Sequence, residues 1–230
     1  MDEGKIGNIE MLCLIVNAIV CKAFFTSIAA AIQKVGTAVW YMTLISTVVT
    51  IGIFSLMYMM TKAYTGKNIL EIYDEIVGKK AGRLFALIFC LILFLSASIT
   101  LREFTDATKV YLLHESPPGF IVGMFIIAMT VVCFVGIEGL ARAGKLFSYI
   151  LLFNFLIVMA LSYKRFDSHR LYPLLGYGIG NTVKNGIMRC SAYGEIILLG
   201  VFAKTLNDTK DAGKIGYISL ILAGLIIAII

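Results

Sequence analysis

Ionisable side chains in two otherwise apolar segments are the residues of this sequence that could do chemistry. Lys22 lies near the middle of residues 11–32, and Glu195 lies within the long apolar segment 179–203. A charged group at membrane depth costs at least about 2.5–3.5 kcal/mol on insertion scales, so it normally faces protein or water. We therefore interpret Lys22 and Glu195 as a cross-helix charge pair or as counter-ions for a ligand. A purely structural buried ion pair is the alternative.

The composition places these residues in a membrane protein. Of the 230 residues, 60% are hydrophobic and 15% are charged, and the mean hydropathy is +0.92. A soluble domain of this size does not need so much apolar surface. Apolar segments recur along the whole chain and predict an all-α polytopic membrane protein. We expect spans near residues 11–32, 38–60, 84–101, 120–137, 146–163, 179–203 and 215–230.

The net charge of +6 follows from topology and not from a nucleic-acid partner. If the N-terminus is cytoplasmic, more Lys and Arg residues fall on the inner than on the outer side of the predicted spans, as the positive-inside rule requires. The first ten residues carry Asp2, Glu3 and Glu10 in place of a basic n-region. The first apolar segment is therefore expected to be a retained span and not a signal peptide.

Residue patterns typical of enzymes and metal sites are missing from the sequence. The five cysteines all lie in apolar segments without close pairs, which is typical of small buried hydrophobic residues. The two histidines, His114 and His169, have no partner at metal-ligand spacing. We expect neither an enzyme nor a metal or other cofactor.

The first and sixth predicted spans are both interrupted by polar residues. The sixth span, 179–203, is cleanly apolar only over residues 196–203, which is too short to cross a bilayer. Two half-helices that meet at a polar break buried in protein would satisfy its backbone. Interrupted spans in corresponding positions indicate an inverted-repeat transporter with a site at the membrane midplane. A polar-lined packing helix with a hydrogen bond to Glu195 is the alternative.

Several other polar residues in the spans could serve helix packing instead of ligand binding. Asn17 could hydrogen-bond a partner helix without any role in binding a ligand. Ser96, Ser98 and Thr100 could simply hold membrane helices together, since hydroxyl groups commonly do so. Tyr193 is a candidate only if the sixth helix is broken.

Two local patterns predict structure outside the interrupted spans. Asn68 followed by Glu71 is a capping box, and it predicts a short amphipathic helix that ends at Gly78. This helix would lie on the cytoplasmic membrane face, or else pack on the bundle as an ordinary helical loop. Glu138 and Arg142 are spaced to form an ion pair on one helical face, most simply as a structural anchor.

Five short motifs occur in a fixed order along the chain. They are Leu101-Arg102-Glu103, Ser116-Pro117-Pro118, Gly136-Ile137-Glu138 with Ala141-Arg142, Leu171-Tyr172-Pro173-Leu174-Leu175, and Gly194-Glu195. Together they resemble the spore germination permease family, the integral B subunits of Ger-type germinant receptors and relatives of amino-acid and polyamine permeases. The resemblance covers essentially the whole chain.

The resemblance implies a five-plus-five inverted-repeat (LeuT-like) permease fold of ten helices, of which about seven are present. Residues 1–230 would form a single transmembrane domain, with the first repeat in 1–170 and the start of the second in 171–230. Because the sequence stops within an apolar segment, we expect the chain to be truncated at its C-terminus relative to the family.

The resemblance also implies an amino-acid-like germinant bound between the first, third and sixth helices. The partners would be A-type and lipoprotein C-type receptor subunits in the spore inner membrane. Cys21, Lys22 and Ala23 stand where the family usually has a Gly-x-Gly break. The expected substrate-binding residues are Asn17, Cys21, Lys22, Ala23, Ser98, Cys190, Ser191, Tyr193 and Glu195.

Three functional hypotheses follow. The protein is a germinant-sensing receptor subunit, a proton-coupled amino-acid transporter, or a non-transporting truncated fragment. In the transporter, Glu195 would carry the proton, with Lys22 as the alternative carrier.

Overall fold

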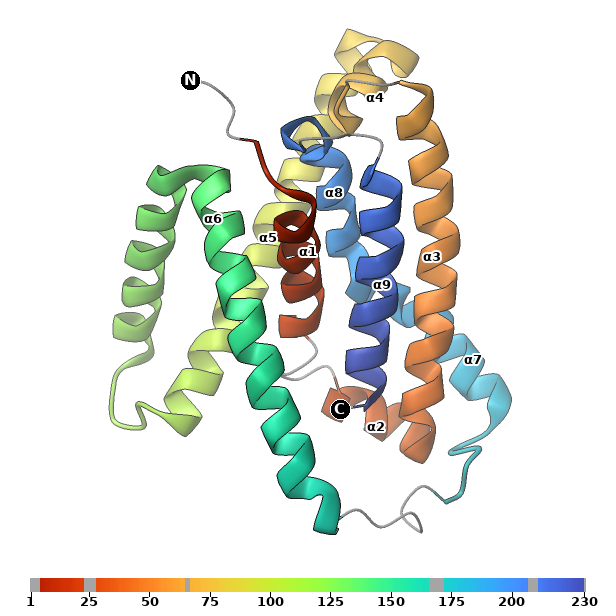
Figure 1. Cartoon of the computed structure of the whole chain (residues 1–230), viewed down its shortest axis with the longest axis vertical. Coiled ribbons are helices and arrows are strands. Elements are labelled where there is room, and N and C mark those ends of the chain that lie inside the picture. Colours follow the sequence, from red (N-terminus) through yellow and green to blue (C-terminus); the bar gives the residue numbers. More distant parts are fainter. Residues whose placement is uncertain (1–4, 23–27, 65–66, 166–171, 207–210, 230) are drawn as a thin grey trace.

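The described part of the protein is built from α-helices and short 3₁₀ helices (Figure 1). The computed structural model describes residues 5–22, 28–64, 67–165, 172–206 and 211–229, so the predicted site residue Ala23 lies outside the described residues. The α-helices are α1 (Asn8–Lys22), α2 (Ile28–Val35), α3 (Val39–Ala63), α4 (Ile69–Val77), α5 (Lys79–Tyr111), α6 (Pro118–Ser162), α7 (Ile179–Met188), α8 (Ile197–Val201) and α9 (Ala212–Ile229).

The chain is an all-α polytopic membrane protein, as its composition predicts. Four helical stretches are long and apolar enough to cross a membrane: Ile28–Ala63, α5, α6 and α9. Within α5 and α6, most large apolar side chains are exposed, for example Leu91, Phe94 and Phe134. Apolar surface of this extent belongs in lipid or against other membrane helices.

The core lies where α9 packs between α1 and α3 (Figure 1). Met11, Ile15 and Ile19 recur on one face of α1 at helical spacing and are buried against this core. Leu220 and Ala223 face them from α9. The core therefore joins the first and last described spans.

Glycines allow α9 to approach α3 closely. A Cβ added at Gly216 would lie 1.9 Å from Cζ of Phe54, and one added at Gly224 would lie 2.3 Å from Oγ1 of Thr47. Small residues let the backbones of membrane helices come close enough for van der Waals packing to hold them. This face of α9 accepts only glycine as long as Phe54 and Thr47 keep their positions.

The fourth and fifth predicted spans form the two arms of α6. We expected a connecting segment between residues 137 and 146, but the helix resumes directly after Gly136, whose backbone angles are φ 83° and ψ 176°. Glycine adopts a positive φ without the steric cost of a Cβ. The chain therefore reverses at a single residue, and the arms lie side by side, antiparallel (Figure 1). The predicted ion pair between Glu138 and Arg142 is confirmed in the turn after the reversal.

One end of the bundle gathers the start of α1, the end of α3, α4 and the start of α9 (Figure 1). The backbone N–H of Ile6 donates to the carbonyl of Thr205 at 2.7 Å. The amide of Asn8 donates to Asp211 at 2.6 Å. These bonds fix the first described residues to the segment between α8 and α9.

Candidate functional site

The predicted break in the sixth span is present. α7 ends at Met188, the 3₁₀ helix η5 (Arg189–Ile196) follows, and α8 resumes the α-helical form for five residues. The residues of η5 include Ser191, Tyr193 and Gly194, which have low or intermediate helix propensity. A 3₁₀ stretch of this length within a span commonly marks a functional hinge or a strained segment.

Lys22 and Glu195 form the predicted cross-helix ion pair. Lys22 is the last residue of α1, and its Nζ pairs with Oε1 of Glu195 on η5. Nζ also donates a hydrogen bond of 2.9 Å to Oγ of Ser96 on α5. The two charged side chains are 28% and 16% exposed, which places the pair mostly inside the protein. Three elements distant in sequence therefore meet at one ammonium group.

The surroundings of the pair favour the charge of Lys22 more than that of Glu195. The C-terminus of a helix carries partial negative charge, and this stabilises an ammonium at the last residue of α1. Glu195 has one oxygen engaged by Lys22, whereas its Oε2 is buried and has no hydrogen-bond partner among the described residues. A buried carboxylate oxygen without a donor is costly, and it offers an acceptor to an incoming donor.

Ser96, and not Ser98, is the α5 hydroxyl at the pair. Ser98 is exposed, and its hydroxyl donates to the carbonyl of Phe94 on its own helix at 2.9 Å. The expected substrate-binding residues include Ser98, whereas the structure places Ser96 at the pair. The part of α5 before these serines is almost wholly apolar, so its periodicity does not identify the inward side. Ser191 is also exposed, with its hydroxyl 3.3 Å from the carbonyl of Met188.

Tyr193 anchors η5 to α3. Its ring is 1% exposed, and its hydroxyl lies 3.0 Å from Oγ1 of Thr47. The hydroxyl of the neighbouring Ser46 on α3 donates to the carbonyl of Gly186 on α7 at 2.7 Å. These contacts fix the broken span against α3, so the structure gives Tyr193 a positioning role beside the ion pair. Cys190 is half-buried in the same segment.

Asn17 and Cys21 lie on another face of α1. The amide of Asn17 donates to the carbonyl of Gly144 on α6 at 3.0 Å, and its oxygen accepts from Ser148 at 3.1 Å. The predicted contact of Asn17 with a partner helix is therefore confirmed. Asn17 and Cys21 line an apolar cleft of about 400 Å³ between α1, α6 and α9. Lys22 and Glu195 are not among the residues of this cleft.

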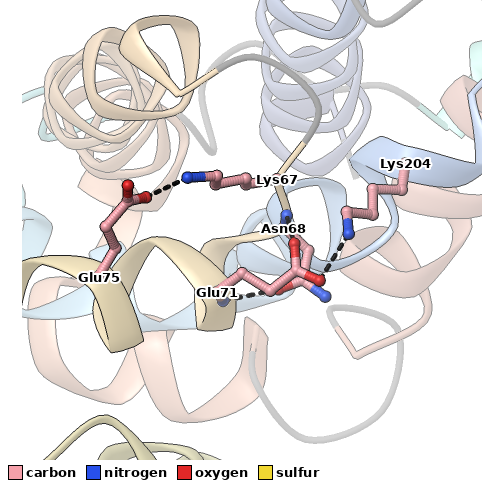
Figure 2. Close-up of polar contacts among 5 residues, drawn as sticks. All are labelled: Lys67, Asn68, Glu71, Glu75 and Lys204. Atoms are coloured by element: carbon pink, nitrogen blue, oxygen red, sulfur yellow. Dashed lines mark hydrogen bonds and ion pairs between the residues drawn. The ribbon is translucent and has the colours of Figure 1, made fainter. Parts of the chain in front are cut away.

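A second charged group lies at the end of the bundle where α4 sits (Figure 2). The predicted capping box is confirmed: Asn68 accepts from the backbone N–H of Glu71, and Glu71 accepts from that of Asn68. Lys204, three residues beyond α8, donates to Glu71 at 2.5 Å, and Lys67 pairs with Glu75. The network ties α4 to the chain that leaves the broken span.

The packing of α4 on the bundle, one of the two predicted alternatives, is confirmed, and its place on a membrane face stays a prediction. Ile69 and Ile72 are buried, and Cδ1 of Ile69 would lie 3.5 Å from a Cβ added at Gly200 of α8, so one face packs on the bundle. Ile76 and Val77 are 50% and 57% exposed on the outer side. This outer side is apolar enough to enter a membrane interface.

The contact of α4 with Lys204 should depend on pH. The hydrogen bond from Lys204 and the backbone bond from Asn68 lower the pKa of the Glu71 carboxyl below its ordinary value of 4.5. The native state then binds fewer protons than the unfolded state. The stabilisation is therefore complete above the unfolded pKa and is lost as the pH falls through the lower native pKa.

We expect Glu71→Gln to lower the melting temperature at neutral pH, and this difference from the wild-type protein to shrink as the pH falls below about 4.5. Thermal unfolding from pH 7 to pH 3 measures it. In a Lys204→Met background, the same substitution should have a smaller effect at neutral pH. A difference that stays constant over the whole range would contradict the assignment.

Together these features define a polytopic helical membrane protein with a partly buried ion pair at a broken span. The family model for spore germination proteins (the spore permease family) matches residues 5–230, and the chain belongs to that family. The resemblance carried by the five motifs is thereby confirmed.

Two curated relatives come from Bacillus subtilis (strain 168). Spore germination protein KB is 27% identical over 199 residues, which cover 84% of this chain and 53% of the relative. Spore germination protein A2 is 26% identical over 183 residues, which cover 76% of this chain and 48% of the relative. The chain thus spans about half the length of these relatives. No solved structure matches the chain significantly.

Proposed function

We propose that this protein is an integral membrane subunit of a spore germinant receptor and that it senses an amino-acid-like germinant between α1, α5 and η5. One observation carries the proposal: Lys22, Ser96 and Glu195 come from three elements and meet inside the protein. Membership of the spore germination family supports the physiological role.

A free amino acid carries a carboxylate and an ammonium group, which can replace the two partners of the ion pair. Its carboxylate would bind the ammonium of Lys22, and its ammonium would bind Glu195, whose Oε2 is buried without a partner in the described part of the chain. Charged hydrogen bonds of this kind are stronger than neutral ones. Binding would replace the internal ion pair by two bonds to the ligand.

Breaking the ion pair would also let the binding of a ligand change the structure outside the site. Separating Lys22 from Glu195 would release η5 from the end of α1, and α8 connects η5 to Lys204 and its partner Glu71 on α4. A ligand that favours one arrangement shifts the equilibrium by its differential affinity. A-type and lipoprotein C-type subunits in the spore inner membrane would read this change.

The wider architecture belongs to the same proposal. The complete subunit would be a LeuT-like inverted repeat of ten helices with a cytoplasmic N-terminus, in which residues 1–170 form the first repeat and 171–230 begin the second. Support for it comes from the interrupted sixth span, in which η5 separates α7 from α8.

Proton-coupled transport is the second candidate function. Glu195 favours it, because a mostly buried carboxylate with an unpartnered oxygen is a suitable proton carrier. Uptake of labelled amino acids by proteoliposomes separates the two functions. Flux above that of protein-free vesicles supports the transporter, and binding without flux supports the receptor.

A change at Lys22 tests the receptor. Spores that carry Lys22→Met should need about 10–150-fold more germinant, because the lost charged hydrogen bond is worth about 1.5–3 kcal/mol. Germination is followed by the loss of optical density over a range of amino-acid concentrations. Arg142→Gln, which breaks the exposed pair with Glu138, is the control and should leave the dose response unchanged. An unchanged response to every amino acid in the Lys22→Met spores would overturn the proposal.

A further inference from the structure

Unpaired positive charge surrounds the corner at which α4 turns into α5. Lys79 and Lys80 lie in the first turn of α5 and Arg83 in the next, and all three side chains are exposed. Within the described chain, none of the three forms an ion pair. Of the nearby acids, Glu71 and Glu75 are already paired with Lys204 and Lys67. Asp74 is the third acid of the cleft and forms no ion pair among the described residues, so three basic side chains stand against one unpaired carboxylate.

The start of α5 has no capping side chain and no acid of its own, and the carboxylate that packs against it, at Gly82, is that of Asp74 on α4. The cap residue of α5 is Gly78 (φ 91°), which forms no side-chain cap bond, and the first turn contains no acidic residue. The free N–H groups of a first turn attract an anion, and cations placed there are unfavourable unless an anion joins them. Both features therefore favour a negatively charged group at this corner.

The corner has room for such a group. A charged cleft of about 710 Å³ opens between α4 and α5. Its walls carry four basic and three acidic side chains: Lys67, Lys79, Arg83 and Lys204, with Glu71, Asp74 and Glu75. Tyr73 on α4 stacks on Phe85 of α5 with ring centroids 3.8 Å apart, so the two helices are held at a fixed angle. This stacking contact between α4 and α5 supports the shape of the cleft.

The apolar surface beside the cleft indicates a lipid and not a soluble anion. From Leu84 onward, α5 exposes apolar side chains along its membrane-crossing part, including Leu87 and Leu91. Ile76 and Val77 at the end of α4 are exposed next to the basic residues. Basic side chains directly before a membrane-crossing apolar segment lie at the depth of the phosphate groups.

We propose that this corner binds the headgroup of an anionic phospholipid, with its phosphate on Lys79, Arg83 and the first turn of α5. The acyl chains would lie along the exposed apolar face that begins at Leu84. The lipid would sit beside Lys204, which joins α4 to the end of the broken span. This inference does not depend on the identity of the germinant or on any germinant being bound.

Lipid titrations followed by native mass spectrometry test the proposal on the purified chain in detergent. Phosphatidylglycerol should be retained in preference to phosphatidylcholine. The double variant Lys79→Gln/Arg83→Gln should lower the affinity for phosphatidylglycerol about 10–30-fold, because each basic residue near an anionic headgroup contributes about 1 kcal/mol. The melting temperature of each variant in phosphatidylcholine alone reports its folding.

Two further variants make the result decisive. Lys164→Gln/Lys184→Gln removes two exposed positive charges elsewhere on the protein and should leave phosphatidylglycerol binding unchanged. Lys79→Arg/Arg83→Lys keeps the charge and should bind phosphatidylglycerol within about twofold of the wild type, since the attraction follows charge. Equal loss in the Lys164 and Lys184 control would overturn the assigned position. Displacement of the lipid by inorganic phosphate at millimolar concentration would overturn the lipid as occupant.

Discussion

Glu195→Leu should lower the melting temperature by roughly 6–12 °C. Removing one partner of a buried ion pair costs about 3–5 kcal/mol, because the other charge is left without compensation, and the partial exposure of this pair places it at the lower end, near 3 kcal/mol. In a protein of this size, each kcal/mol shifts the melting temperature by about 2–4 °C. Lys22 would retain only its bond to Ser96, and its 28% exposed side chain gives water limited access to the ammonium. Thermal unfolding of the purified protein in detergent measures the shift.

The double variant Lys22→Met/Glu195→Leu separates the charge from the packing. Replacing both members of a buried pair by apolar residues is often neutral or stabilising, so this variant should melt near or above the wild type. The exposed pair of Glu138 and Arg142 is the matched control, and Glu138→Ala should cost no more than about 0.5 kcal/mol. If Glu195→Leu melts together with this control, Lys22 and Glu195 do not form a buried pair.

The double variant also separates stability from function. A protein that folds normally without the two charges, yet no longer responds to its germinant, would assign Lys22 and Glu195 to ligand binding. A response preserved in that variant would leave the pair with a structural role alone. The two alternatives that the sequence left open are therefore distinguished by a single protein.

The sequence predicted the parts of this structure in which charge or local hydrogen bonding decides the outcome. A lysine and a glutamate at membrane depth have few stable partners other than each other, so Lys22 and Glu195 could be paired without coordinates. The capping box at Asn68 and the ion pair at Glu138 depend only on residues three or four positions apart.

Features that depend on which side of an apolar helix faces inward could not be predicted. The apolar middle of α5 does not show which side faces inward, and the expected site residue was Ser98, whereas Ser96 is the serine that contacts Lys22 of α1. The reversal of α6 depends on the backbone angles of Gly136, and the sequence around it also fits an ordinary turn between two spans. The substrate-binding role of the predicted residues, including Cys21, Cys190 and Ser191, stays a prediction.

The close approach of α9 to α3 gives the other large expected effect. Gly216→Val should lower the melting temperature by roughly 2–12 °C, because overpacking a tight contact costs about 1–3 kcal/mol. Even the Cβ of the new side chain would lie 1.9 Å from Cζ and 2.5 Å from Cε1 of Phe54. Phe54 is 1% exposed and packs edge-on against Tyr217 at 5.1 Å, so its ring has little room to move.

Two further variants show whether steric contact causes the effect. Gly52→Val places the same side chain on α3 where no atom lies within 4 Å of the new Cβ, so it should be nearly neutral. Phe54→Ala alone should be costly, because it empties a buried site. Combined with Gly216→Val, it should cost less than the sum of the two changes, since the valine methyl groups occupy space that the ring leaves. If the two changes in melting temperature add strictly, Gly216 and Phe54 do not touch. The packing of α9 between α1 and α3 would then have to be revised, and the position of η5 depends on that packing.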